Sequence, residues 1–177
     1  EAGGHPPDHQ NPEQCEIAHW DSERDYGNRK AFITEVTLVT QDDEPTMAPV
    51  CGEAVTLRIS SICNVDINSL LAGFIIRDRT GQIVFGENTI GQKRLTVNRS
   101  STTCICFKFI MPVLHPGSYS LSAAVSDGDE LQFETLHYKP DVLVLTPNVK
   151  GRPVHGVFAI TKMAITSEVQ PSDDTQK

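Results

Sequence analysis

From residue 31 onward, short runs of this chain alternate between apolar and polar residues. A period of two is typical of β-strands that bury one face. In AFITEVTLVT, residues 31–40, the even positions are predicted to face the core: Phe32, Thr34, Val36 and Leu38. In AVTLRISSI, residues 54–62, the corresponding positions are Val55, Leu57 and Ile59. We therefore expect a strand in each run.

Residues 73–89, GFIIRDRTGQIVFGENT, place two apolar runs around a tight polar turn. Gly81 supplies the positive φ that a short hairpin turn requires. The apolar face predicted for this hairpin comprises Phe74, Ile76, Ile83 and Phe85. Alternation then sends Arg77 to the opposite face. In GSYSLSAAV, residues 117–125, the same rule separates Ser120, Ser122 and Ala124 from Leu121 and its neighbours.

Regularly spaced short strands with turn residues between them predict an all-β chain, folded as an antiparallel β-sandwich. No long stretch after Ala31 has a helical period, and 177 residues are enough for one core without disulfides. We divide the chain into a linker with a short N-terminal segment, the sandwich and a disordered tail: residues 1–30, 31–165 and 166–177. Asn11-Pro12-Glu13-Gln14 is a favourable helix start, which allows a short helix carrying Ile17 and Trp20.

Charge and cysteine content narrow the choice of partner and compartment. The net charge is −8 and basic residues are scattered singly, which argues against nucleic acid and against an anionic membrane surface. The five cysteines are an odd number and resemble no disulfide framework, so we predict that all are reduced, as in the cytoplasm. Cys104 and Cys106 lie two residues apart in a strand-like run, and we predict that they share a face as small core residues.

No motif in the chain predicts catalysis or a cofactor. A nucleophile elbow, a P-loop, a dinucleotide fingerprint and zinc-ligand spacing are all missing from the sequence, so we predict no enzyme, no cofactor and no metal site. The acidic residues single out no pair of carboxylates for glycoside hydrolysis. We therefore consider three functions: carbohydrate binding, dimerisation or protein interaction, and modification of a glycan by an enzyme. The sequence supports the enzyme least.

Polar residues at the ends of the hairpin are suited to binding a sugar. A sugar needs planar amide, guanidinium or carboxylate groups for its hydroxyls, and an apolar or aromatic surface for its C–H face. The candidates are Arg77, Asp78, Asn88, Thr89, Ser120 and Ser122, with Tyr26 or Trp20 as a stacking wall. A purely structural role is the alternative for two of them, because Asp78 can cap the turn and Asn88 can satisfy backbone groups at a strand end.

Several stretches, in this order, resemble a known family: RDYGNRKAFITEVTLV, CGEAVTLRI, GFIIRDRTGQIVFGENT, FKFIMPVLHPGSYSLSAAV and HGVFAIT. Together they run from about Arg24 to Thr161 and are similar to the C-terminal carbohydrate-binding domain of Wzt-type nucleotide-binding proteins, from ABC transporters that export O-antigen polysaccharide. The resemblance implies an immunoglobulin-like or jelly-roll sandwich that binds the non-reducing end of the glycan before export. It also implies a homodimer, a nucleotide-binding domain preceding Glu1 that contacts the transmembrane subunit, and a cytoplasmic location peripheral to the inner membrane.

The last predicted strand, in HGVFAIT, follows the connection PNVKGRP and is therefore the element most easily added across an interface. We predict that residues Val157 to Ile160 contribute to the homodimer. The alternative to glycan binding is a sandwich that serves only dimerisation or protein interaction. An excess of exposed apolar residues on one face, without a groove, would favour that alternative.

Overall fold

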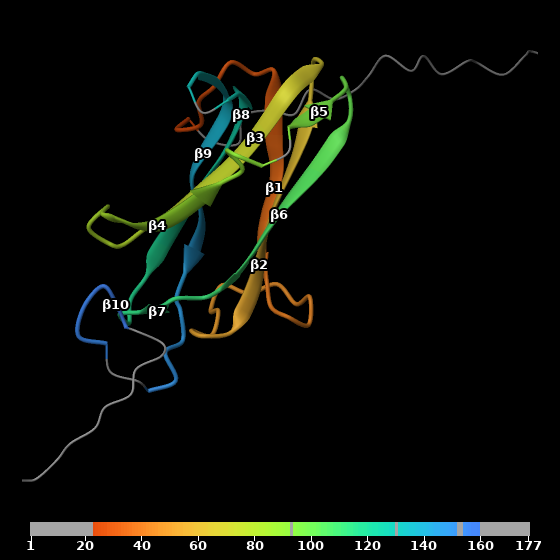
Figure 1. The fold of residues 1–177 in the computed structure, drawn as a ribbon. Helices are drawn as coiled ribbons and strands as arrows, with labels where there is room; N and C mark the ends of the chain where they lie inside the picture. Colours follow the sequence, from red (N-terminus) through yellow and green to blue (C-terminus); the bar gives the residue numbers. More distant parts are fainter. Residues whose placement is uncertain (1–22, 93, 130, 152–153, 160–177) are drawn as a thin grey trace, which may run out of the picture.

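The computed structural model describes residues 23–92, 94–129, 131–151 and 154–159, and these form an antiparallel β-sandwich (Figure 1). The described residues contain strands and turns but no helix, which confirms the predicted fold class. They accordingly include no helix long and apolar enough to cross a membrane. The short helix expected before residue 21 and the tail 166–177 lie outside the described residues.

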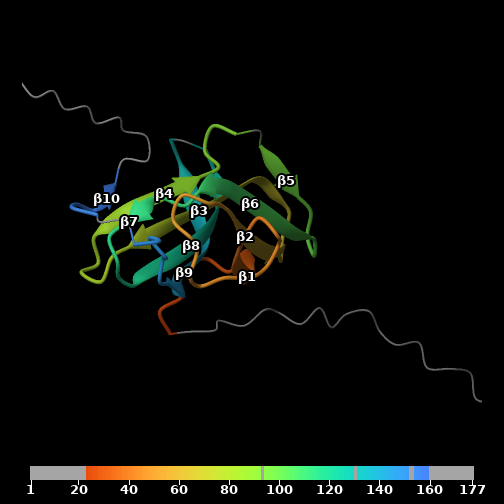
Figure 2. The ribbon, with the colours of Figure 1, turned by 90° about the horizontal axis from the view of Figure 1, so that it is seen from below.

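Two sheets lie face to face (Figures 1 and 2). The smaller has the strand order β1-β2-β6, made of β1 (Ala31–Val39), β2 (Ala54–Cys63) and β6 (Thr102–Ile110). The larger has the order β4-β3-β8-β9, made of β4 (Ile83–Asn88), β3 (Ile67–Arg77), β8 (Tyr119–Gly128) and β9 (Phe133–Leu145), with β5 (Leu95–Val97) also on β3. A short antiparallel ribbon joins β7 (Val113–Leu114) to β10 (Phe158–Ala159).

The core between the sheets follows the alternation expected from the sequence. Val55, Leu57 and Ile59 of β2 are buried, whereas the positions between them face outward. From the other sheet, Ile76 of β3 and Leu121 of β8 are fully buried opposite them. Each such side chain contributes about 1.5–3 kcal/mol by leaving water.

Two irregularities in strand register overturn core assignments made from alternation. Thr34 was predicted to face the core but is exposed, because the pairing of β1 with β2 shifts between Ile33 and Glu35. Ile83 is 55% exposed because the register of the β3–β4 pair shifts between Ile76 and Arg77, which sets Ile83 opposite Arg77. A β-bulge reverses the facing of every residue beyond it, so simple alternation fails there.

The described cysteines differ in burial, and Cys51 is half-buried. Cys63 is buried in the core, and this burial raises the pKa of its thiol. Cys104 and Cys106 share a face as predicted, but it is the outer face of β6 and both are exposed, so the assignment to the core was wrong. Cys15 lies outside the described residues. The described cysteines are free thiols, and the reduced state of all five stays a prediction.

The segment that precedes β1 lies along the outer edge of β9. Tyr26 and Tyr138 exchange backbone hydrogen bonds, and the Asn28 amide donates to the Thr135 carbonyl. Beneath this contact the Asp25 carboxylate is buried, with Oδ2 at 3.4 Å from Nε2 of His137. Residues 24–29, which the sequence placed in the N-terminal segment, thus form a short extension of the larger sheet.

Candidate functional site

The outer face of the larger sheet carries a row of residues that runs across its strands. Strand pairing aligns Asn88 of β4 with Gly73 of β3, Gly73 with Ala124 of β8, and Ala124 with Tyr138 of β9. An isolated bridge then adds Tyr26 next to Tyr138. Paired residues in an antiparallel sheet point to the same side. The row therefore has two small residues in its middle, an amide at one end and two aromatic rings at the other.

The two tyrosines form a stacked pair. Their ring centroids are 4.8 Å apart with an interplanar angle of 25°, and Tyr26 is 56% exposed. Exposed aromatic rings offer an apolar surface with a polar tip, which suits the C–H face of a sugar and one of its hydroxyls. The stacked pair thus has the chemistry of a wall for a carbohydrate ligand.

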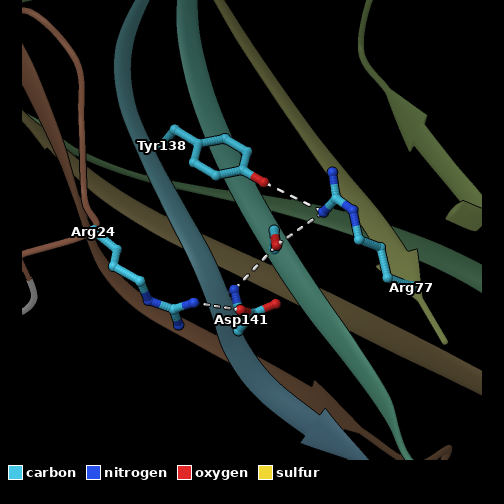
Figure 3. Close-up of polar contacts among 5 residues, drawn as sticks. Arg24, Arg77, Tyr138 and Asp141 are labelled. Atoms are coloured by element: carbon cyan, nitrogen blue, oxygen red, sulfur yellow. Dashed lines mark hydrogen bonds and ion pairs between the residues drawn. The ribbon is translucent and has the colours of Figure 1, made fainter. Parts of the chain in front are cut away.

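Two neighbouring rows place the serines beside Arg77. Arg77 aligns with Ser120, and Ile75 aligns with Ser122. The Arg77 guanidinium donates from Nη1 to Ser122 Oγ and to Tyr138 Oη, both at 3.4 Å (Figure 3). These long contacts hold the guanidinium over the sheet without saturating its five donors.

Asp141 closes this polar cluster from an irregular part of β9. Its backbone amide donates to Ser122 Oγ at 3.0 Å, and its Oδ2 accepts from Arg24 Nη1 at 2.8 Å (Figure 3). A hydrogen bond from Ser120, followed by the contact with Arg24, holds the pKa of the Asp141 carboxyl below its ordinary value. The carboxylate is therefore ionised at neutral pH and orients Arg24 beside the tyrosine pair.

A groove of about 490 Å³ lies along the row. Gly73, Ala124 and Ile75 contribute to its floor, while Asn88 and Tyr138 line it from opposite strands. Three strand spacings, about 14 Å, separate the backbones of β4 and β9 across it. This width is enough for one or two sugar rings lying flat on the small floor residues.

The structure brings five of the seven predicted site residues onto this face. Asn88 and Tyr26 belong to the row of the groove, and the Arg77–Ser120 pair lies four residues away along the strands. Ser122 also faces this side but is only 1% exposed, beneath Arg77 and the backbone of Asp141. Its hydroxyl therefore positions Arg77 rather than meeting a ligand directly.

The other two predicted residues make local contacts. Asp78 Oδ1 accepts hydrogen bonds from Thr80 and Gln82 within the hairpin turn, which also lower the pKa of this carboxyl. Thr89 Oγ1 accepts from the Ala72 amide at 3.0 Å. Asn88 combines both kinds of role, since its Oδ1 accepts from the Ile90 amide at 2.8 Å while the residue stays exposed.

The prediction from the sequence missed three residues of the site. Tyr138 and Asp141 lie on β9, and Arg24 lies before β1. Tyr138 had no clear signal, because Leu136 and His137 are both buried and alternation does not say which way the next residue faces. Asp141 had a weak signal, because the preceding Pro140 marks an irregular strand position. Arg24 had none, since its partner is 117 residues away in the chain.

In the described ranges, no group of three or more His, Cys, Asp or Glu side chains is arranged to hold a metal ion. Among the described residues that line the groove, the only carboxylate is that of Glu87.

An antiparallel sandwich with a groove across the outer face of one sheet defines a class of β-sandwich domain suited to ligand binding. The Wzt C-terminal domain family matches residues 22–160, and the chain belongs to this family. Among solved structures, the crystal structure of the C-terminal domain of Wzt superposes with a TM-score of 0.75 at 18% sequence identity. That match covers 81% of this chain and 87% of the other, and at this identity it shows a shared fold. No curated protein sequence matches the chain.

Proposed function

We propose that this domain is a non-catalytic carbohydrate-binding module that recognises the non-reducing end of an O-antigen polysaccharide for export by an ABC transporter. The observation that carries the proposal is the groove between Asn88 and the Tyr26–Tyr138 pair, floored by Gly73 and Ala124. It combines the two features that a sugar requires, an aromatic wall and planar hydrogen-bonding groups.

The chemistry of the groove favours binding over hydrolysis. Glycoside hydrolysis ordinarily uses two carboxyl groups on either side of the scissile bond. The described lining offers one, Glu87, and the nearest further carboxylate of the polar cluster, Asp141, is paired with Arg24. A module of this kind selects completed polysaccharide chains. The transporter to which the module belongs then exports them.

Membership of the Wzt C-terminal domain family supports the transporter context. In that context the domain lies in the cytoplasm, peripheral to the inner membrane, and acts with a nucleotide-binding domain and a transmembrane subunit. Titration calorimetry with fragments of the host's own O-antigen, including ones that carry and lack the natural non-reducing end, tests the proposal. Binding confined to fragments with that end supports it, and absence of binding to all fragments contradicts it.

Loss of Arg77 or Asn88 is expected to weaken glycan binding. Arg77→Ala and Asn88→Ala each remove a donor group beside the groove, and loss of such hydrogen bonds costs about 1–3 kcal/mol of binding free energy. Both variants should keep the melting temperature to within a few degrees, because Asn88 is exposed and Arg77 is only partly buried on the outer face. Calorimetry and thermal melts measure the two effects.

Arg79→Ala and Asn98→Ala are the matched controls, since both residues are exposed and lie outside the groove. They should bind glycan as the unmodified chain does. Unchanged affinity in Arg77→Ala and Asn88→Ala, together with a large loss of stability, would show that these residues serve the fold and that glycan binds elsewhere.

The second candidate function is a dimerisation module, and the β7–β10 ribbon favours it. β10 is only two residues long, and its Phe158 is 62% exposed although it is a large apolar residue. Exposed apolar residues on a short edge strand are typical of contacts between chains. Dimerisation is compatible with glycan binding, because this ribbon lies apart from the groove (Figure 1).

We propose a homodimer whose interface includes Val157 to Ile160, of which Ile160 lies outside the described residues. Deletion of everything from His155 onward is expected to produce a monomer or an aggregate, because it removes β10 and the exposed Val157 and Phe158. Light scattering coupled to size exclusion measures the mass. A well-behaved dimer after the deletion would show that the interface lies elsewhere.

A further inference from the structure

Two exposed thiols stand side by side on the outer face of β6. The Sγ atoms of Cys104 and Cys106 are 3.9 Å apart, and both residues are exposed. They occupy alternate positions of an edge strand of the β1-β2-β6 sheet, so the backbone holds both side chains on the same side. Cysteine is ordinarily among the most buried residues, so an exposed pair is unusual.

The surroundings of the pair are basic. Arg58 of β2 aligns with Cys106, and Lys108 follows on the same face of β6. Arg58 also forms an ion pair with Asp43, which keeps its guanidinium near the strand surface. Cations beside a thiol favour its thiolate form, which is the form that binds metals.

We propose that Cys104 and Cys106 form a bidentate site for a thiophilic divalent cation, with zinc as the best-matched ion. Two sulfur ligands of a tetrahedral zinc ion, each about 2.3 Å from the metal, lie about 3.8 Å apart. The observed separation of 3.9 Å is therefore close to that of a ligand pair already in place. Thiolate ligands select zinc and similar soft cations over magnesium and calcium.

Binding proceeds without any oxidant. The cation replaces the two thiol protons and forms two metal–sulfur bonds, so two protons are released for each ion bound to the neutral pair. Because protons compete with the cation for the two sulfurs, affinity for the cation should increase with pH. Since both sulfurs are exposed, the remaining coordination positions face solvent.

Titration of the fully reduced chain with Cd²⁺ tests the site, because cadmium bound to thiolates absorbs in the ultraviolet. We expect a charge-transfer band to appear as Cd²⁺ is added. Protons released by the thiols should be measurable in a pH-stat during the same titration. Cys104→Ser and Cys106→Ser should each weaken binding by about 100-fold or more, because loss of one arm of a chelate removes its effective concentration. Zn²⁺ in excess should compete with Cd²⁺ for the two sulfurs and reduce the band.

Cys15→Ser and Cys51→Ser serve as controls and should leave the titration unchanged. Cys104 and Cys106 are both exposed, so their serine variants should fold normally. Circular dichroism measures whether they do. The same band in a Cys104→Ser/Cys106→Ser double variant would overturn the proposal, as would absence of a band in the unmodified, reduced chain. Because the thiols lie on the opposite sheet from the groove, this result is independent of glycan binding.

Discussion

Ala124→Trp is expected to abolish glycan binding while the domain stays folded. Ala124 lies in the middle of the groove floor, between Gly73 and Tyr138, and its side chain points outward from the larger sheet. An indole at this position occupies the space that a sugar ring needs and separates the ligand from both Asn88 and the tyrosines. The clash should weaken binding by roughly 100-fold or more, equivalent to at least about 2.7 kcal/mol.

The fold should tolerate this change because Ala124 is only partly buried and its paired neighbour on β3, Gly73, has no side chain. Thr102→Trp is the matched control, since Thr102 is an exposed strand residue of the other sheet. Calorimetry with the O-antigen fragments, alongside thermal melts, compares the two variants. Full affinity in Ala124→Trp would place the glycan away from this groove, whereas equal loss in both variants would indicate a general effect on folding.

Gly27→Ala is expected to cause a large loss of stability. Gly27 has φ +143°, and a Cβ at this position would be 2.2 Å from the backbone oxygen of Leu136. The strain and the clash both involve backbone, so neither can relax by a side-chain rotation. We expect a reduction of about 2–4 kcal/mol in the free energy of unfolding, measured by chemical denaturation.

Gly27→Ala should also affect ligand binding. Gly27 lies between Tyr26 and Asn28, which both form hydrogen bonds with β9. Displacing this segment moves Tyr26 from its stack with Tyr138, so glycan affinity should also decrease. Gly81→Ala is the control: it has φ +85° but no heavy atom within 4 Å of the added Cβ. It should cost only about 1–2 kcal/mol from backbone conformation and leave affinity unchanged. Equal losses in the two variants would show that the close approach to β9 has no role.

The buried contact of Asp25 with His137 explains how the N-terminal segment is held at the site. Nδ1 of His137 accepts a hydrogen bond from the Ile33 amide at 2.9 Å, so the ring proton lies on Nε2 and faces Asp25. Both side chains are almost fully buried, at 2% and 1% exposure. Flanking Asp25 on the chain are Arg24 and Tyr26, the two residues that reach the polar cluster and the aromatic wall. Burial of one side chain thereby orients both of its neighbours outward.

The pattern of apolar, polar and turn residues was enough to predict much of the core, the hairpin turn and part of the outer face of this protein. Alternation in β2 and β8 assigned the core residues correctly, because a strand with one buried face must repeat every two residues. Gly81 marked the hairpin turn, and it has the positive φ that the turn requires. The same alternation put Arg77, Ser120 and Ser122 on one outer face, which strand pairing confirms.

Only the tertiary structure decided what the outer face holds and which irregularities interrupt it. The bulge near Arg77 exposes Ile83, because a shift of one residue in register reverses the facing of the strand beyond it. Cys104 and Cys106 have the spacing of a shared face, but spacing alone does not say which face lies inside, and at the sheet edge it is the outer one. Tyr26 meets Tyr138, and Arg24 meets Asp141, across more than 100 residues of chain. Such contacts depend on the order of strands in the sheet, which no local pattern of residues specifies.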